Sequence, residues 1–180
     1  MSNYCNIAPG HPIHGLYHDT EYGFPTTNER ELFERLTLEI FQAGLSWLIV
    51  LKKREHLKRA FRDFDVNHVS RFTKSDIKLL KSDTSIIRNQ LKIEATVYNA
   101  SVILDFRQSH GGFSNWLMSC HPKNNDEWSA LFKRHFKFTG PVVVDEFLIS
   151  IGYLPGAHSN NCPITSVISG INPPWQNQKV

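Results

Sequence analysis

The hydrophobic positions of the chain recur mainly at helical spacing. Between Asn28 and Gly44 the apolar residues return every three or four positions, which is typical of an amphipathic helix. Asn28 with Glu31 predicts a capping box at its start, and Gly44 predicts a stop at its end. No series of alternating apolar and polar positions, as strands require, runs through the chain. The pattern therefore predicts an all-α fold.

Further helix starts follow along the chain. Ser46 is expected to cap a second helix, which begins with an apolar run, becomes basic and therefore leads from the core toward solvent. Asp65 predicts the start of a short helix. Thr73 with Asp76 predicts another, which ends near Asp83.

Three more helices are expected in the second half of the chain. An apolar stripe predicts a long helix over about residues 89–107, closed by the glycines at 111 and 112. Residues 124–135 and 141–151 predict two more, the second with Pro141 at its first position. Residues 142–144 also suit a short strand. The tail from residue 164 on is expected to be irregular.

Length and composition favour one globular domain. A chain of 180 residues suffices for one hydrophobic core and is short for two, so we expect a single domain over residues 1–180. Hydrophobic residues make up 41% and charged residues 21%, which is ordinary for a folded protein and argues against disorder. Three cysteines without disulfide-like spacing favour a reducing compartment, with Cys120 a core or surface thiol.

The N-terminal sequence and the net charge bear on location and partners. No basic and then apolar leader opens the sequence, and no apolar run approaches membrane length. We therefore expect a soluble protein of the cytoplasm with no membrane partner. A net charge of +3 permits an anionic partner such as DNA but is too small to indicate one.

One acidic residue interrupts the apolar face of the first long helix. Leu32, Leu36, position 39 and Ala43 share one stripe, because steps of four, three and four stay on one face. Position 39 is Glu39. An unpaired carboxylate on a buried face costs several kcal/mol. Glu39 is therefore paired with a base, exposed at the helix edge, or lining a polar hollow.

The residues after Glu39 favour a polar hollow. Gln42 lies one turn further on, and Ser46 and Trp47 open the next helix directly after a short turn. A carboxylate, an amide and an indole can therefore converge at one corner, which suits the binding of a flat polar ring. Ordinary core packing of Trp47 is an equally simple interpretation.

Cysteine and histidine occur near both ends of the chain. His158 and Cys162 are four residues apart, and Cys5 and His18 supply a second pair. Two cysteines and two histidines form a closed tetrahedral set that suits structural Zn²⁺. A spacing of four also arises by chance, and His11 and His14 could take the place of His18.

Six blocks of sequence point to a known family. They are YHDTEYGFP (17–25), LFERLTLEIFQAGLSW (32–47), LKKRE (51–55), FRDFD (61–65), IIRNQLKIEATVYNA (86–100) and FKFTGP (136–141). In content and order these blocks resemble the signature blocks of the DNA-3-methyladenine glycosylase I family. The resemblance covers most of the chain from Cys5 to Cys162.

The resemblance implies an all-α helix-hairpin-helix glycosylase that excises 3-methyladenine from double-stranded DNA containing alkylated bases. It implies that Glu39 is the catalytic, lesion-binding carboxylate, that Trp47 stacks on the flipped base and that Tyr17 supplies a pocket hydroxyl. Tyr22 and Gln42 are expected to complete this base-binding pocket. A monomer that acts at the nucleoid is expected.

The resemblance also implies a zinc staple, meaning one structural Zn²⁺ ion that ties the two ends of the chain together. Its ligands would be Cys5, His18, His158 and Cys162. The turn DTSIIRN matches the family's hairpin, so weak contacts to the DNA backbone are expected. The residues concerned are Ser85, Arg88 and Lys92.

Some positions depart from the family pattern. Ile7 and Tyr22 stand where the family commonly has Trp, and His14 stands where it commonly has Tyr. A thinner aromatic pocket is therefore expected, in which a protonated His14 would repel a cationic lesion. Ser85 replaces a glycine, so the hairpin turn is expected to be strained. Asp145 is not assigned a catalytic role.

Two alternative functions fit the same residues. One is a zinc-stapled DNA-binding module that recognises damage without cutting. The other is a glycosylase for a different alkylated base. Glu39 and Trp47 favour an enzyme, because a pocket without activity has no use for a carboxylate on an apolar stripe.

Overall fold

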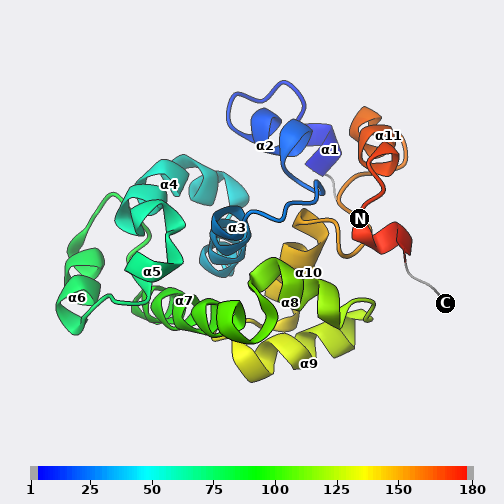
Figure 1. Cartoon of the computed structure of the whole chain (residues 1–180). Helices are drawn as coiled ribbons and strands as arrows, with labels where there is room; N and C mark the ends of the chain where they lie inside the picture. Colours follow the sequence, from blue (N-terminus) through cyan, green and yellow to red (C-terminus); the bar gives the residue numbers. More distant parts are fainter. Residues whose placement is uncertain (1–3, 178–180) are drawn as a thin grey trace.

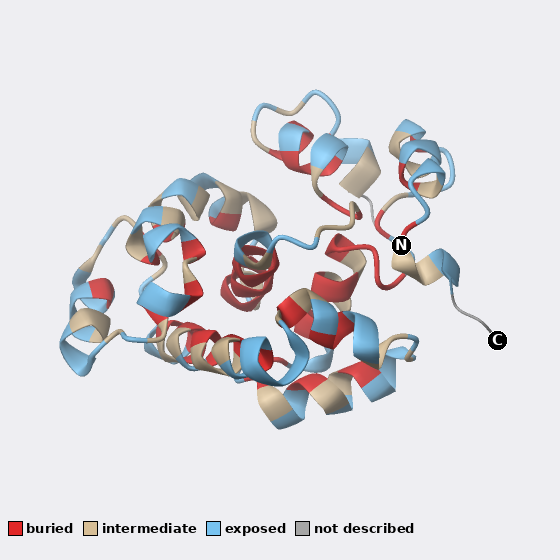
Figure 2. Ribbon diagram, in the orientation of Figure 1, coloured by how far each residue is buried: buried red, intermediate tan, exposed pale blue. Residues whose placement is uncertain are grey.

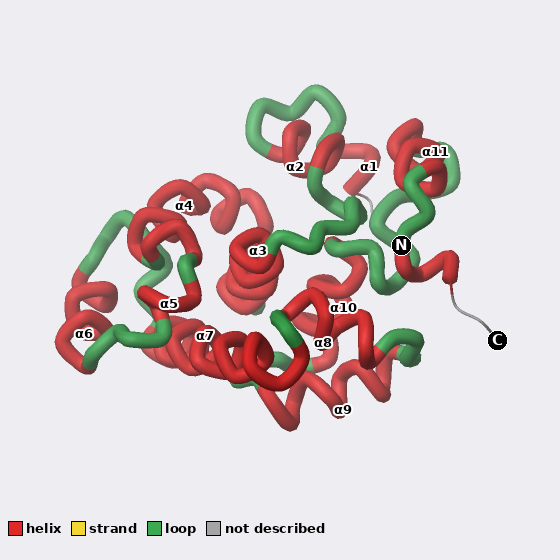
Figure 3. The backbone as a smooth tube through the Cα atoms, in the orientation of Figure 1, coloured by secondary structure: helices red, strands yellow, loops and turns green. Residues whose placement is uncertain are grey.

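The computed structural model describes residues 4–177, and all regular elements in this range are helices (Figure 3). The all-α prediction is therefore confirmed. The elements, in chain order, are α1 (Tyr4–Ile7), α2 (His14–Thr20), α3 (Glu29–Gln42), α4 (Trp47–Ala60), η1 (Arg62–Phe64), α5 (Val66–Val69), α6 (Lys74–Ser82), α7 (Gln90–His110), α8 (Phe113–Cys120), α9 (Asn125–His135), α10 (Pro141–Ser150), α11 (Pro163–Gly170) and η2 (Pro174–Asn177).

Helix α3 lies in the middle of the molecule and is covered by other helices on several sides (Figure 1). It contacts α4, α7, α8 and α10, and all of its residues from 32 to 41 are buried. Figure 2 shows this helix buried along most of its length. Any polar side chain on α3 must therefore find a partner inside the protein or face an internal hollow.

The start of α3 differs in detail from the prediction. The Asn28 side chain accepts hydrogen bonds from the backbone N–H groups of Arg30 (3.0 Å) and Glu31 (3.4 Å). Glu31 does not complete a capping box, because its carboxylate accepts from the Thr26 hydroxyl at 2.6 Å. Ser46 is the N-cap residue of α4, but its side chain makes no capping hydrogen bond.

The capping box of α6 is confirmed. The Thr73 hydroxyl accepts from the Asp76 N–H at 3.3 Å, and the Asp76 carboxylate accepts from the Thr73 N–H at 2.7 Å. The long helix α7 is confirmed as well. It ends at Gly111, whose φ of 76° is favourable only for glycine among common residues.

Two expectations for the second half of the chain were wrong or incomplete. Residues 142–144 form the first turn of α10 and not a strand. The tail after residue 164 is not irregular throughout, because α11 begins at Pro163 and continues to Gly170. The short helices α1, α2 and α8 were not predicted. None of the described helices has the length and apolar character needed to span a membrane.

Lys92 joins α7 to the C-terminus of α3. Its side chain is buried, and Nζ donates to the carbonyl oxygens of Phe41 at 2.9 Å and Ala43 at 2.6 Å. These carbonyls belong to the helix end and have no partner within the helix, so an ammonium group stabilises them. The prediction that Lys92 contacts DNA phosphates is therefore wrong. Instead, this residue fixes the turn that leads from α3 to α4.

Candidate ligand pocket and metal centre

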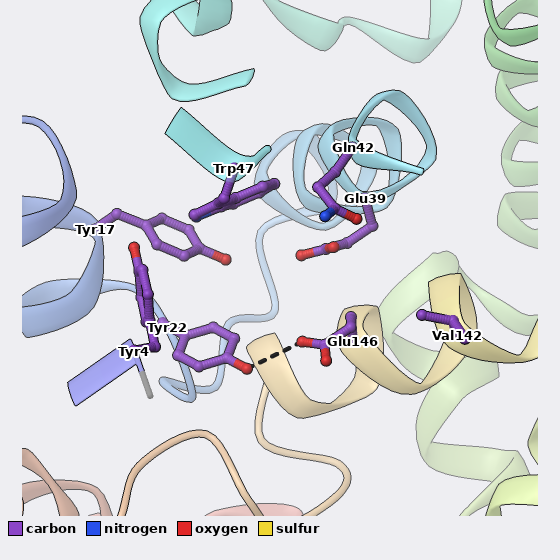
Figure 4. A pocket seen from close by; sticks show the side chains of 8 residues that line it. All are labelled: Tyr4, Tyr17, Tyr22, Glu39, Gln42, Trp47, Val142 and Glu146. Atoms are coloured by element: carbon purple, nitrogen blue, oxygen red, sulfur yellow. Dashed lines mark hydrogen bonds between the residues drawn. The ribbon is translucent and has the colours of Figure 1, made fainter. Parts of the chain in front are cut away.

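A hollow of about 250 Å³ opens where α1, α2, α3, α4 and α10 meet. Helix α3 contributes two lining residues, α10 contributes two, and the others come from the N-terminal segment and the start of α4. Figure 4 shows these side chains around a common space, with those of Tyr17, Glu39 and Glu146 directed toward it. The lining residues are Tyr4, Tyr17, Tyr22, Glu39, Gln42, Trp47, Val142 and Glu146.

Glu39 lies at this hollow with only 5% of its surface exposed. No residue between 4 and 177 forms a hydrogen bond or ion pair with its carboxylate. Burial, together with the negative charge of Glu146, raises the Glu39 pKa from 4.5 to about 8. Of the three interpretations of Glu39, the polar hollow is the one that the geometry supports.

Aromatic side chains form one wall of the pocket. The Trp47 and Tyr17 rings are 5.1 Å apart between centroids, and the Tyr17 and Tyr22 rings are 5.7 Å apart. Gln42 is held by its own turn, because its amide nitrogen donates to the Leu45 carbonyl at 3.0 Å. All five residues expected at the pocket therefore line it, and Trp47 is half-buried there while also packing against the core.

Three lining residues were not found by sequence reasoning. Tyr4, Val142 and Glu146 come from segments that lie far from α3 along the chain. Glu146 accepts a hydrogen bond from the Tyr22 hydroxyl at 3.0 Å. A partial signal for Glu146 was present, because Asp145 and Glu146 are the two carboxylates of a largely apolar helix, but the sequence does not show which of them faces the pocket.

Tyr4 adds an aromatic ring that sequence reasoning did not place at the pocket. Its ring lies 5.7 Å from that of Tyr22, and its hydroxyl pairs with His14 Nδ1 at 3.1 Å. His14 is buried behind Tyr4 and does not line the pocket. Burial and the nearby His11 lower the His14 pKa, which favours the neutral ring. Ile7 is 58% exposed and also lies outside the pocket lining.

The second site is a cluster of two cysteines and two histidines from opposite ends of the chain. The ligand atoms of Cys5, His18, His158 and Cys162 all lie within 4.8 Å of one another. His158 Nδ1 is 3.7 Å from Cys5 Sγ, 3.5 Å from Cys162 Sγ and 3.2 Å from His18 Nε2. Cys162 Sγ is 3.8 Å from His18 Nε2. This cluster could hold one metal ion.

Neighbouring groups orient both histidines of the cluster. His18 Nδ1 lies 2.6 Å from the Asp19 carboxylate, which leaves Nε2 directed at the other ligand atoms. His158 Nε2 lies 2.8 Å from the Tyr22 carbonyl oxygen, which leaves Nδ1 directed the same way. Such outer contacts are usual around metal-binding histidines. His11 is not part of the cluster, because its Nδ1 accepts backbone hydrogen bonds at 3.1 Å.

The cluster and the pocket share a boundary. Tyr17 precedes His18 directly in α2, and the backbone carbonyl of Tyr22 contacts His158. The pocket wall formed by these two tyrosines is thus attached to the cluster at both places.

The expected DNA-contacting turn joins α6 to α7. Arg88 is exposed there, whereas the Ser85 N–H donates to Asp83 at 2.8 Å and the Ser85 carbonyl accepts from Lys53 at 2.7 Å. Ser85 is not among the described residues with positive φ, so the expected strain is absent. Asp145 does not line the pocket.

Fold and site together define an all-helical protein with a binding pocket for a flat polar ring. Aromatic groups and carboxylates around one hollow suit the faces and the edge of such a ring. A Cys₂His₂ cluster lies between the N-terminal wall of this pocket and the C-terminal segment.

Comparison with known proteins identifies the family. The sequence model of the methyladenine glycosylase family matches residues 8–165. A DNA-3-methyladenine glycosylase of Haemophilus influenzae is 36% identical, over 91% of this chain and 98% of that protein. The structure of 3-methyladenine DNA glycosylase I from Staphylococcus aureus matches with a TM-score of 0.80 at 34% identity, over 90% of this chain and 96% of that one. A variant of a 3-methyladenine DNA glycosylase I in complex with 3-methyladenine matches with a TM-score of 0.80 at 34% identity, over 91% and 97%. The chain belongs to the methyladenine glycosylase family.

Proposed function

We propose that this protein hydrolyses the N-glycosidic bond of 3-methyladenine in alkylated DNA. Family membership supports the reaction class, and the similar structure bound to 3-methyladenine supports the base. The observation that carries the assignment is Glu39, a buried carboxylate with no partner among the described residues, facing an aromatic pocket. Such a group costs folding free energy and is retained where a ligand uses it.

Recognition in this proposal begins with a flipped nucleotide. An enzyme that acts on a base must extrude it from the duplex, and N3 methylation eases this step by weakening base pairing. Trp47 provides the indole face for stacking, and Tyr17 and Tyr22 continue the wall. The positive charge of the bound base favours the ionised form of Glu39, which accepts a hydrogen bond from the exocyclic amine.

Charge distinguishes the lesion from normal adenine. The methylated ring is cationic while it is attached to the sugar, so it is favoured over an indole face and beside a carboxylate. Normal adenine is neutral, so it gains neither the attraction of a cation to the indole face nor the attraction to the carboxylate. The cationic base is already a good leaving group, so the protein need supply little acid catalysis. A second catalytic acid such as Asp145 is not required.

We further propose that the Cys₂His₂ cluster holds one structural Zn²⁺ ion. With Zn–S bonds of about 2.3 Å and Zn–N bonds of about 2.0 Å, a tetrahedral ion separates sulfur from nitrogen by about 3.5 Å and the two nitrogens by about 3.3 Å. The observed separations of 3.5 to 3.8 Å and 3.2 Å fit these values. Four protein ligands leave no position for a reactive water, so the ion would stabilise the fold.

The remaining parts of the proposal concern the DNA substrate. The turn between α6 and α7 would approach the backbone of double-stranded DNA in the manner of a helix-hairpin-helix, with Arg88 as its exposed cation. One chain contains both the pocket and the turn. We therefore propose that it acts as a single-domain monomer, in the cytoplasm at the nucleoid.

The test is to compare wild type, Glu39→Gln and Glu55→Gln on methylated duplex DNA and to identify the released bases. Wild type should release 3-methyladenine, and Glu39→Gln should be slower by on the order of a hundredfold, because a charge-assisted contact is removed. Glu55 is an exposed glutamate of α4, so its variant should match wild type.

Melting curves of the same three proteins separate a role in binding from a role in folding. Glu39→Gln should melt at the same temperature as wild type or higher, because a neutral amide costs less to bury. Full activity together with a lowered melting temperature would overturn the assignment. Release of another alkylated base, or of none, would instead favour one of the two alternative functions.

A further inference from the structure

One aromatic side chain outside the pocket is exposed on a strained backbone. Phe138 lies in the loop between α9 and α10 and is 38% exposed, the one exposed phenylalanine between residues 4 and 177. Its φ is 61°, in the left-handed region that glycine or asparagine adopts readily and a bulky side chain does not. An exposed ring gains little from burial to offset this cost, so packing alone does not explain a phenylalanine at this position.

Buried side chains hold this backbone conformation from both sides. Asn99 of α7 is buried, and its Oδ1 accepts from the Lys137 N–H at 2.8 Å while its Nδ2 donates to the Lys137 carbonyl oxygen at 3.1 Å. The buried Thr139 hydroxyl donates to the Phe136 carbonyl oxygen at 3.2 Å. The Phe138 ring is therefore held in one place, and its backbone loses conformational freedom on folding and not on binding.

The ring lies beside the turn that joins α3 to α4. Lys92 Nζ, which donates to the last carbonyl oxygens of α3, is 5.5 Å from the centre of the Phe138 ring. Gln42, at the end of α3, lines the pocket. Val142, four residues after Phe138, also lines it and is exposed, so it belongs to the rim (Figure 4). Phe138 thus lies next to the pocket without lining it.

The proposed DNA-contacting turn leads to the same ring. Lys92 lies in the first turn of α7, shortly after the α6–α7 turn with its exposed Arg88. Because Lys92 connects α7 to the end of α3, the Phe138 ring beside it lies on the way from this turn to the pocket. A duplex whose backbone contacts the turn, and whose extruded nucleotide enters the pocket, must pass over this ring. An aromatic ring there suits a base and not a phosphate.

We infer that Phe138 enters the base stack of the bound duplex beside the extruded nucleotide and so stabilises the extruded state. The inference rests on the proposed function and extends it from the pocket to the rest of the DNA. Extrusion of a nucleotide leaves the neighbouring bases unstacked, and an apolar side chain inserted at such a step replaces part of the lost stacking. Stacking on a ring is possible for every base, so this contact acts on extrusion and not on the choice of base.

Three ligands separate this contact from the pocket and from the DNA backbone. They are free 3-methyladenine, an undamaged duplex, and the same duplex with a tetrahydrofuran abasic site, in which one base is already missing from the stack. Phe138→Ala should bind the abasic duplex about tenfold more weakly than wild type, because one aromatic stacking contact is lost. Its affinity for the free base and for the undamaged duplex should change less than about twofold, because the pocket and the backbone contacts remain.

Two further variants distinguish stacking from a structural role. Phe138→Tyr keeps a flat ring and should bind the abasic duplex within about twofold of wild type. Phe138→Gly removes the ring and relaxes the left-handed backbone, so it should melt at a higher temperature than Phe138→Ala and yet bind the abasic duplex as weakly. Met118→Ala, at an exposed apolar residue of α8 outside the pocket lining, is the matched control and should resemble wild type.

The outcomes separate this inference from the proposed function. If Phe138→Ala binds the abasic duplex as tightly as wild type, or if binding recovers together with stability in Phe138→Gly, the inference is wrong while the glycosylase assignment stands. Equal weakening toward free 3-methyladenine would also contradict it, because Phe138 would then act through the pocket. If wild type releases no base from methylated DNA, the proposed function fails, and the inference that rests on it fails as well.

Discussion

Two pairs of buried or half-buried glutamates in this protein differ in whether a cation lies between them. Glu21 and Glu34 share the guanidinium of Arg54, which donates to Glu21 at 2.7 and 2.8 Å and to Glu34 at 2.8 Å. Glu39 and Glu146 face a hollow with no cation in its lining. Glu34 and Glu39 lie on the same helix, so position on α3 alone does not decide which pair receives a partner.

The difference separates carboxylates that support the fold from carboxylates that are available to a ligand. In the first pair, burial alone would lower the Arg54 pKa, but the bonds to Glu21 and Glu34 raise it overall. In the second pair, burial and mutual repulsion raise the Glu39 pKa. The first arrangement stabilises the folded state, whereas the second weakens it and leaves the carboxylates available to a ligand.

The largest expected effect concerns a third acidic pair, the thiols of Cys5 and Cys162. Two neighbouring thiolates repel each other unless a cation lies between them, as Arg54 lies between Glu21 and Glu34. We predict about one bound zinc per chain, and loss of most of it in Cys162→Ser. If the ion acts as a cross-link, the variant should lose about 4–5 kcal/mol of stability. Metal analysis and denaturant unfolding measure both quantities.

Cys120→Ser is the matched control for this prediction, because Cys120 lies outside the cluster. It should keep its metal and most of its stability. Equal metal content and equal melting of the two variants would contradict the zinc proposal.

The next effect tests the paired side of the comparison. Arg54→Met keeps the aliphatic part of the side chain but leaves Glu21 and Glu34 without their cation. We expect a loss of about 3 kcal/mol in the free energy of unfolding at neutral pH, because removal of one partner leaves buried charges uncompensated. Urea unfolding measures it, with the exposed Lys52→Met on the same helix as control. Similar losses in both variants would show that the pairing contributes little.

Sequence reasoning identified the helices with their own local signals. The helices α3 and α4 have amphipathic periodicity, Gly111 closes α7, and Thr73 with Asp76 marks α6. The helices α1, α2, α8 and α11 have at most eight residues each. Helices this short are held by tertiary packing, and for α1, α2 and α11 the Cys₂His₂ cluster lies beside or within them. Their local sequence therefore contains little of the information that forms them.

The same distinction applies to the site. Glu39, Gln42 and Trp47 were predictable together, because one helix and one turn determine their relative positions. Glu146 and Tyr4 reach the pocket only through contacts between segments distant in sequence. Lys92 was misassigned for a related reason, since a lysine at a helix start suits a phosphate contact until the neighbouring C-terminus of α3 is known.

A smaller effect tests the unpaired side of the comparison. The Glu39 pKa is about 8 in the folded protein against 4.5 ordinarily. Below about 4.5 the residue is neutral in both states, so its contribution to stability is greatest there. As the pH rises toward 8, Glu39 ionises in the unfolded chain but stays protonated in the folded protein. The free energy of unfolding therefore falls. Glu39→Gln should lack this fall.

Urea unfolding at about pH 5 and about pH 8.5 provides the measurement. The stability of Glu39→Gln relative to wild type should increase by about 2–4 kcal/mol between the two conditions. Subtracting wild type from variant cancels the other titrating groups. A difference that does not change with pH would mean that Glu39 has a partner in solution and belongs with the paired carboxylates.

The smallest effect concerns a charge on the surface. The Arg88 side chain is exposed and does not neutralise a buried acidic group. Its removal should therefore lower the free energy of unfolding very little. We predict that Arg88→Ala binds undamaged duplex DNA a few-fold more weakly, and that its salt dependence falls by about one phosphate contact. The released base should not change, because a backbone contact contains no information on the base. Binding titrations at several salt concentrations test this, with Arg134→Ala on α9, away from the α6–α7 turn in Figure 1, as control. An altered lesion preference in Arg88→Ala would show that this turn acts on the pocket, and not on the DNA backbone alone.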